Sequence, residues 1–291
     1  MLFLSVLKPV LVFPGNSRLS APSHSRGCRE EQLPNATQFI ADLARSVGFL
    51  SRLPVPDRFF RGYDGSVSRA VQAFPAAGLV IALVPALILW LLCQSHDPLL
   101  AALAALGLQS LLTGGLHEDG LADAADGLGG GRDREHALVI MKDSRIGSYG
   151  VIALILSFGL RAAALAALGR FDPALAALGL LAASAASRAL MVAHWRALPP
   201  VREGGVAASA GQPEKHARNI ALLTGAVAAL VLLVPVAGPA RSLLPLVFAG
   251  LVAFGFTRSV EKKLGGHTGD TIGATQQLSE IALLAGLALT L

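Results

Sequence analysis

Seven apolar segments, most of them long enough to cross a lipid bilayer, dominate this chain of 291 residues. A transmembrane helix needs about 20 mostly apolar residues. The segments cover residues 74–93, 98–116, 149–169, 173–195, 219–237, 243–257 and 272–291. Only 15% of all residues are charged, against about 25% in an average soluble protein. We therefore predict an all-α fold, a polytopic membrane bundle of about seven spans.

The connections between these segments differ sharply in their content of Lys and Arg. Sixteen of these residues fall in segments 45–69, 117–148, 196–218 and 258–263. The remaining connections contain only Arg170 and Arg241. Because positively charged loops stay in the cytoplasm, we predict a cytoplasmic N-terminal side and a C-terminus on the opposite side. The basic residues form no patch interleaved with aromatic residues, so we expect no nucleic-acid partner.

The N-terminal part of the chain is more polar than the rest. Residues 1–38 are predicted to be a disordered or dispensable extension, and residues 39–291 a single membrane-embedded catalytic domain with lipid as its surroundings. Within it, segment 37–53 has apolar residues at helical spacing, which is typical of an interfacial amphipathic helix. A short helix that caps the bundle is the alternative. The sequence leaves the oligomeric state open, a homo-oligomer included.

Acidic residues are concentrated in segment 114–150, which holds 7 of the 19 Asp and Glu residues. Asp119, Asp123 and Asp126 are spaced so that a helix would place them on one face. Three like charges repel one another unless a cation neutralises them, and oxygen ligands suit Mg²⁺ or Mn²⁺. We predict a metal site here, with Glu118 as an assisting ligand. The alternative is a solvated acidic helix face.

Two further motifs follow this acidic helix. The run Gly127–Gly131 predicts a flexible turn whose backbone N–H groups can face an anion. The motif KDSR then brings together Lys142, Asp143, Ser144 and Arg145. Its cations suit a phosphate ligand, and Asp143 would be either a metal ligand or a general base. Helix capping with an ordinary ion pair is the alternative.

Several polar residues lie within or beside the apolar segments. Arg188 lies inside a span and is expected to face the bundle interior with a partner. Arg161, nearer the end of its span, is expected to extend toward the membrane surface. The loop LPPVREGG contains Arg202, and the Gly-rich stretch before the last span contains Asp270. Such a stretch is typical of non-helical backbone that lines a polar cavity.

Six blocks of the sequence resemble the cobalamin synthase family, whose members are adenosylcobinamide-GDP ribazoletransferases (cobalamin-5′-phosphate synthases). The blocks are FLSRLPVP (49–56), AFPAAGL (73–79), GGLHEDGLADAADG (114–127), IMKDSRIGSYG (140–150), LPPVREGG (198–205) and LGGHTGDTIGA (264–274). They occur in the family's order over residues 39–290. The acidic block followed by KDSR is the most specific of them.

The resemblance implies a Mg²⁺-dependent enzyme of the bacterial inner membrane whose active site faces the cytoplasm. A hydroxyl group of α-ribazole, or of its 5′-phosphate, would attack the corrinoid-proximal phosphate of adenosylcobinamide-GDP, and GMP would leave. Phosphoryl transfer depends mainly on positioning and charge neutralisation. The metal ligands would be Glu118, Asp119, Asp123 and Asp126, and the catalytic residues Asp126 and Asp143. The substrate-binding residues would be Lys142, Ser144, Arg145, Arg188, Arg202 and Asp270.

Two other classes of membrane protein share some of these features. CDP-alcohol phosphotransferases also use an Asp-rich helix and Mg²⁺, but their DG-x-x-AR motif contains an Arg that this chain lacks. A transporter would explain the broken helices and the Arg within a span. A transporter binds its ligand near the bilayer midplane, whereas the polar motifs here are predicted to lie at the cytoplasmic edge.

Overall fold

The computed structural model describes residues 36–63, 65–201 and 210–291, and in these ranges the chain is helical and forms no strand. The predicted N-terminal extension covers residues 1–38, and residues 1–35 of it lie outside the described residues. Helix α2 (Ala36–Leu50) begins directly after residue 35. The long helices that follow are α3 (Phe74–Cys93), α4 (Pro98–Thr113), α5 (Leu116–Gly130), α7 (Ser148–Phe171), α8 (Pro173–Ala197), α10 (Lys215–Ala237), α11 (Pro239–Leu264) and α12 (Gly269–Leu289). The shorter elements are η1 (Asp57–Phe59), η2 (Ala70–Ala73) and α6 (Arg134–Ile140). The predicted all-α fold is confirmed.

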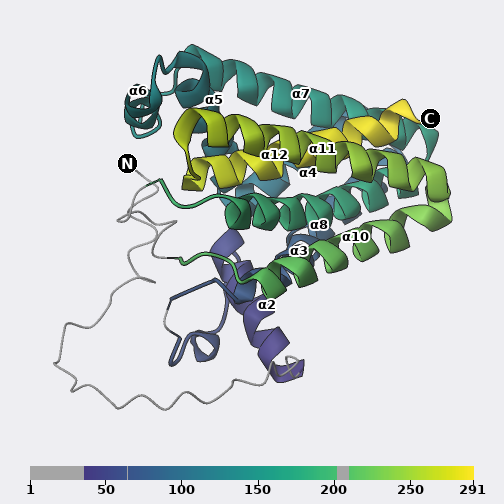
Figure 1. Cartoon of the computed structure of the whole chain (residues 1–291). Coiled ribbons are helices and arrows are strands. Elements are labelled where there is room, and N and C mark those ends of the chain that lie inside the picture. Colours follow the sequence, from purple (N-terminus) through teal and green to yellow (C-terminus); the bar gives the residue numbers. More distant parts are fainter. Residues whose placement is uncertain (1–35, 64, 202–209) are drawn as a thin grey trace.

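Most of the long helices run side by side along one direction (Figure 1). Six candidate spans are long and apolar enough to cross a membrane: η2 together with α3, then α7, α8, α10, α11 and α12. The pair α4 and α5 passes the same test only together, and it is bent by 91°. The described part of the chain therefore has six spans, or seven if the bent pair is one of them, in agreement with the prediction.

The bend between α4 and α5 corrects the prediction that one apolar span runs through residues 98–116. Helix α4 ends at Thr113, and the next two residues are Gly114 and Gly115 with φ of 69° and 73°. This left-handed conformation is readily available only to glycine. The pair stops one helix and starts the next at a new angle, so the acidic segment crosses the bundle instead of extending α4.

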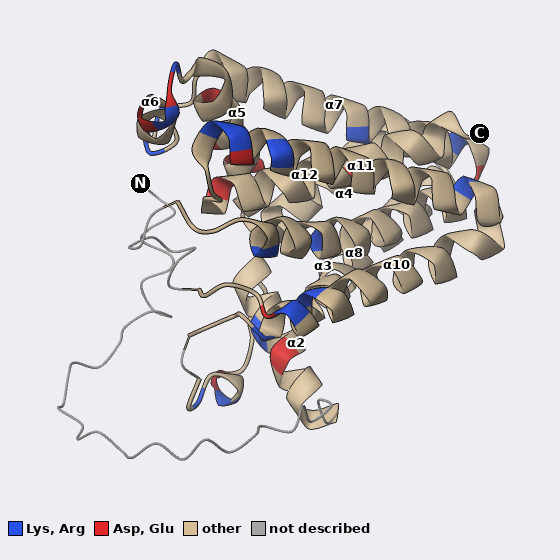
Figure 2. Cartoon of the chain, in the orientation of Figure 1, with Lys and Arg blue, Asp and Glu red and all other residues tan. Residues whose placement is uncertain are grey.

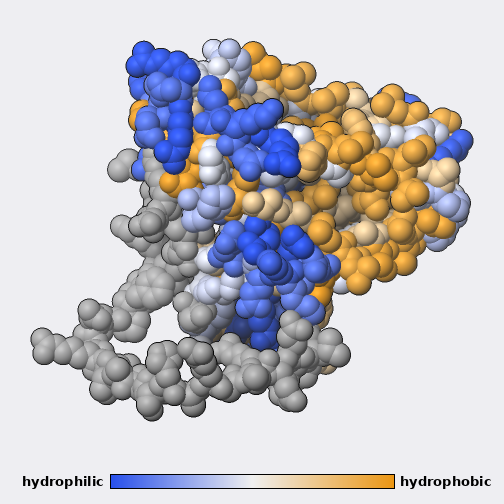
Figure 3. Space-filling model, in the orientation of Figure 1, coloured by the Kyte–Doolittle hydropathy of each residue, from blue (hydrophilic) through white to orange (hydrophobic). Residues whose placement is uncertain are grey.

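Small residues pack the centre of the bundle. Helix α8 contacts α3, α7, α10, α11 and α12, and most of its buried residues are small, namely Ala, Gly or Ser. Small side chains let helix backbones approach closely in lipid, where Leu gains nothing over the lipid tails. The outer faces of α3, α7, α10 and α11 instead carry exposed Leu, Val, Ile and Phe side chains, and they form a broad apolar surface (Figure 3).

The charged residues gather at the end of the bundle that carries α5 and α6 (Figure 2). Helix α2 lies near the same end and contacts α3 and η2. Its Val47 and Leu50 share a buried core with Phe74 and Ile81 of α3. Helix α2 therefore caps the bundle, while Ile40 remains exposed on its outer side.

The glycine run after the acidic motif is helical as far as Gly130, so the predicted turn over 127–131 is wrong. These glycines serve close packing instead. A Cβ atom on Gly127 would come within 2.9 Å of the carbonyl oxygen of Ala137 in α6. A Cβ atom on Gly129 would lie 2.9 Å from the ring of Tyr149 in α7. Their missing side chains let α6 and α7 lie against α5.

Candidate active site

The acidic helix α5 packs closely against α12. Gly120 is the point of closest approach, since a Cβ atom there would lie 2.9 Å from the carbonyl oxygen of Asp270. Gly273 of α12 faces the same point, since a Cβ atom on Gly273 would lie 3.5 Å from the Cα atom of Gly120. Two glycines thus allow the two helices to pack closely, and this contact brings Asp270 next to the acidic motif.

Asp119, Asp123 and Asp270 form the open part of this acidic group. Asp119 is exposed, whereas Asp123 and Asp270 are half-buried. The acidic neighbours that act electrostatically on Asp123 are Asp119, Asp270 and Asp126. The helical spacing predicted for the three aspartates of α5 is therefore present. Asp270, predicted only as a substrate-binding residue, is a fourth member of the same cluster.

Asp126 is engaged by the protein itself. The backbone N–H of Gly147 donates a hydrogen bond to its Oδ2 atom (2.7 Å), and that of Gly150 donates to Oδ1 (2.9 Å). Both donors lie at the start of α7, Gly147 as its N-cap and Gly150 in its first turn, where free N–H groups need an acceptor. Gly147, the residue before α7, provides no side-chain cap, so the carboxylate of Asp126 takes that place. By contrast, Asp119 and Asp123 have no hydrogen-bond or ion-pair partner among the described residues.

Glu118 lies inside the bundle and is only 8% exposed. Its Oε1 atom accepts a hydrogen bond from Ser110 Oγ (3.0 Å) and lies 3.6 Å from Arg161 Nη2. The structure thus gives Glu118 a partner from the protein. Its role as an assisting metal ligand stays a prediction.

Arg161 corrects the prediction that it extends toward the membrane surface. The residue is 1% exposed, and its Nη1 atom lies 3.1 Å from Glu280 Oε1. Glu280 is completely buried in α12. Neither the spacing of Arg161 nor that of Glu280 in the sequence indicates that they meet, because 119 residues separate them. An ionisable residue inside an apolar helix was the available signal.

Asp143 pairs with its neighbour in the KDSR motif. Arg145 donates to both of its carboxylate oxygens, with the shortest contact 2.6 Å between Nη2 and Oδ2. These hydrogen bonds lower the pKa of Asp143 to about 2. Lys142 and Ser144 are exposed beside the pair. Asp143 is thus a weak base at neutral pH, and the arrangement matches the ion pair that was the alternative for this motif.

The other predicted substrate-binding residues lie in different parts of the molecule. Arg188 is completely buried in α8, as predicted, and its Nη1 atom donates to Ser184 Oγ (2.6 Å). Arg202 lies outside the described residues. The loop before it is joined to the segment before α12, because Val201 N donates to His267 O (3.1 Å) and His267 N to Pro199 O (2.8 Å). Burial lowers the pKa of His267 to about 4, so its ring is neutral at pH 7.

No preformed metal cage exists in residues 36–63, 65–201 and 210–291. No three His, Cys, Asp or Glu side chains there are arranged to hold an ion by themselves. The acidic cluster has the oxygen chemistry that Mg²⁺ prefers, and Mg²⁺ commonly binds through one or two carboxylates together with water and substrate phosphates. The cluster fits such a shared site better than a site made of protein ligands alone.

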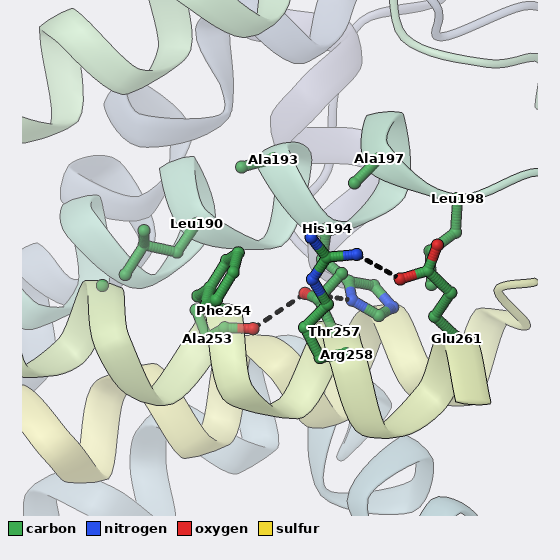
Figure 4. Close-up of a pocket in the computed structure, with 11 residues that line it drawn as sticks. Leu190, Ala193, His194, Ala197, Leu198, Ala253, Phe254, Thr257, Arg258 and Glu261 are labelled. Carbon is green, nitrogen blue, oxygen red and sulfur yellow. Dashed lines mark hydrogen bonds and ion pairs between the residues drawn. The ribbon is translucent and has the colours of Figure 1, made fainter. Parts of the chain in front are cut away.

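Two cavities lie elsewhere. One of about 390 Å³ lies between α8 and α11, and Figure 4 shows Phe254 and the ion pair of Arg258 with Glu261 along it. His194 in its wall accepts or donates a hydrogen bond with Thr257 (2.9 Å). The other, of about 640 Å³, is lined by α2 and the segment that leads into η2, and includes Asp42. Neither cavity is lined by a predicted site residue.

Comparisons with known proteins point to the same family over nearly the whole described domain. The sequence profile of a family described as cobalamin-5-phosphate synthase matches residues 42–288. A protein of Rhizobium meliloti (strain 1021) named adenosylcobinamide-GDP ribazoletransferase is 58% identical over 254 residues, which are 86% of this chain and 97% of the relative. Proteins with the same name from Rhizobium etli and Brucella anthropi are 54% and 43% identical, each over 87% of this chain and 98% of the relative. No solved structure matches the chain.

Proposed function

Because this chain belongs to the cobalamin-5-phosphate synthase family, we propose that it joins α-ribazole, or its 5′-phosphate, to adenosylcobinamide-GDP and releases GMP. It is a helical membrane transferase of cobalamin synthesis. The three relatives are named for this reaction, and the match covers at least 97% of the length of each of them. The product would be adenosylcobalamin or its 5′-phosphate.

In this reaction the hydroxyl oxygen of the ribazole forms a bond to the corrinoid-proximal phosphorus. The bond from that phosphorus to the oxygen bridging to GMP breaks, so GMP leaves with the bridging oxygen, and the hydroxyl proton passes to a base or to water. Negative charge is present on the diphosphate throughout and increases on the leaving oxygen. Positioning and charge neutralisation therefore supply most of the catalysis.

The observation that carries the proposal is the convergence of Asp119, Asp123 and Asp270 at the α5–α12 contact. A diphosphate cannot approach these carboxylates without a cation between them, since like charges at such distances repel. Bound Mg²⁺ would neutralise the phosphate oxygens and stabilise the developing charge. Asp119 and Asp123 would hold the ion, and Asp270 would complete the acidic side of the site. The exposed Lys142 would offer a positive charge to the diphosphate.

The site is proposed to face the cytoplasm of a bacterial cell from its inner membrane. The charged connections gather at the α5–α6 end of the bundle (Figure 2), and positively charged connections favour the cytoplasm. Nucleotides are available there, which suits a substrate that carries GDP.

The test uses the whole protein, purified and placed in lipid nanodiscs. It is given adenosylcobinamide-GDP and α-ribazole with Mg²⁺, and GMP and the corrinoid product are measured by chromatography. We expect the two to form in equal amounts, no turnover after chelation of divalent ions, and recovery when Mg²⁺ is restored. Absence of GMP release under all conditions would reject the proposed reaction. Full activity in the presence of chelator would reject only the proposed dependence on Mg²⁺.

Substitution of Asp123 tests the metal site directly. Asp123→Asn removes one of the mutually repelling charges but keeps the size of the side chain. We expect the turnover to fall on the order of 100-fold or more at limiting Mg²⁺, because an ion at the diphosphate supplies several kcal/mol of stabilisation. Thermal unfolding should be unchanged or shifted upward, since a like-charge repulsion is relieved. Normal turnover at limiting Mg²⁺ would show that Asp123 is not a ligand.

A further inference from the structure

A layer of charged side chains lies inside the bundle, below the acidic cluster. Arg161 of α7 is 1% exposed, with Glu280 of α12 on one side at 3.1 Å and Glu118 of α5 on the other at 3.6 Å. These three residues come from three different helices. Arg161 thus links the acidic helix α5 to α12 and to its own helix, α7.

Neutral side chains complete this layer. Gln109 Nε2 and Gln276 Nε2 donate to the two carboxylate oxygens of Glu280 at 3.1 and 2.7 Å. Ser110 Oγ donates to Glu118 Oε1 at 3.0 Å. Arg188, completely buried in α8, is a second cation that acts electrostatically on both carboxylates. Two arginines and two glutamates balance, so the layer carries no net charge.

Such a layer is expensive within a membrane unless its charges are paired. Removing one partner of a buried ion pair leaves an unpaired buried charge, which is strongly unfavourable. Arg161 therefore has little freedom to leave either carboxylate. Because it lies between them, the position of Glu118 is set by Glu280 of α12.

Helix α5 needs such an anchor. It follows a 91° bend through two left-handed glycines, Gly114 and Gly115. Its far end is held at α7 by Asp126. Glu118 holds its first turn, and Asp119 is the next residue. A rotation of α5 about its axis would move Asp119 and Asp123 away from Asp270.

We infer that Glu118 and Arg161 are positioning residues that hold α5 against α12, and that Glu118 acts through Arg161 and not as a metal ligand. The inference deepens the proposed function, on which its kinetic consequence rests. Its structural part concerns the placement of α5 alone. The two parts can therefore fail separately.

The experiment compares Glu118→Gln, Arg161→Gln and the double variant with the unaltered protein in nanodiscs. Arg161→Lys is the conservative variant, and Arg258→Gln is the matched control, since it removes an arginine from an exposed ion pair with Glu261. Three quantities are measured: kcat and KM for GMP release, the Mg²⁺ concentration that gives half-maximal turnover, and hydrogen exchange of the α5 backbone amides.

We expect each single variant to lower kcat on the order of 100-fold, as displacements of about 1 Å do. KM should change little. The double variant should be no worse than the singles, because residues that act through one contact are not additive. Both single variants should speed exchange in α5 and raise the Mg²⁺ requirement equally, Arg161→Lys should recover part of the activity, and Arg258→Gln should leave all three quantities unchanged.

Two results would overturn the inference. One is unchanged exchange in α5 of Glu118→Gln and Arg161→Gln, which decides the structural part even if the protein releases no GMP. The other is an increased Mg²⁺ requirement in Glu118→Gln alone, with additive losses in the double variant, which would make Glu118 a ligand. If Arg161→Gln does not fold, Arg161→Lys replaces it in the double-variant comparison.

Discussion

Asp123 and Asp126 lie three residues apart on α5, yet their carboxylates have different surroundings. Asp126 is buried and accepts two backbone hydrogen bonds at the start of α7. The positive end of that helix offsets its charge. Within the described part of the chain, the electrostatic neighbours of Asp123 are other acidic groups. Because backbone N–H groups already stabilise the carboxylate of Asp126, a bound cation would interact mainly with Asp123 and Asp119.

Asp126→Asn should therefore destabilise the protein. The amide oxygen can replace one acceptor, but the amide nitrogen cannot accept the second N–H group and leaves it unsatisfied. We expect a loss of about 1–3 kcal/mol, measured as a lower thermal midpoint in detergent. Asp172→Asn is the control, since Asp172 caps α8 through one N–H group and Asn caps helices equally well. Equal midpoints for the two variants would contradict this role of Asp126.

The low pKa of Asp143 predicts a pH profile without a contribution from this residue. Its carboxyl group has a pKa of about 2, below the ordinary value of 3.8, because Arg145 donates to it. The stabilisation is present above pH 3.8 and is lost as the pH falls toward 2. From pH 5 to 9 the group stays ionised. Asp143→Asn should thus leave the shape of the kcat profile over this range unchanged, and loss of an acidic limb would identify Asp143 as the base.

At the scale of elements, the site depends on how closely two helices can pack. Helices α5 and α12 meet at Gly120 and Gly273, and the carbonyl of Asp270 occupies the space that a side chain on Gly120 would need. The distance between α5 and α12 therefore depends on the absence of a side chain at Gly120. Side chains in cores have few voids in which to move away.

Gly120→Ala should lower activity more than a Gly→Ala change elsewhere in the bundle. The new Cβ atom would lie 2.9 Å from the Asp270 carbonyl, so α5 must shift. We expect at least a tenfold loss of kcat, given the cost of small misplacements, and a loss of stability of about 1–3 kcal/mol from overpacking. The control is Gly107→Ala in α4, where nothing lies within 4 Å, and this change should stabilise the helix slightly. Similar kcat values for the two variants would exclude a tight α5–α12 contact.

Helix positions were predictable from sequence, and contacts between distant residues were not. The span predicted at 74–93 has these limits in α3, because a long apolar run is a local signal. The bend at Gly114 was missed, since the two glycines and Leu116 were counted as the end of the apolar run. The capping of α7 by Asp126 joins residues 21 and 24 positions apart. No periodicity indicates such a partner, and the same holds for Arg161 and Glu280.

The whole molecule separates its polar chemistry from its lipid-facing surface. The apolar outer faces of α7, α10 and α11 dominate one part of the surface in Figure 3, and hydrophilic residues cover the α5–α6 end. The chain crosses between the two ends seven times if α4 is counted with its bent partner. An odd number of crossings places the C-terminus opposite the polar end, as Figure 1 shows. The charged ends of the helices therefore predict the orientation of the bundle in the cell.

This orientation can be tested with single cysteines. In a protein whose Cys28 and Cys93 are replaced by Ser, one cysteine is placed at exposed Arg132 at the polar end, or at exposed Arg241 in the first turn of α11. A membrane-impermeant maleimide is added to spheroplasts. We expect rapid labelling of Arg241→Cys, and labelling of Arg132→Cys only after lysis, because basic connections remain in the cytoplasm. The reverse pattern would place the acidic cluster outside the cell and separate it from cytoplasmic nucleotides.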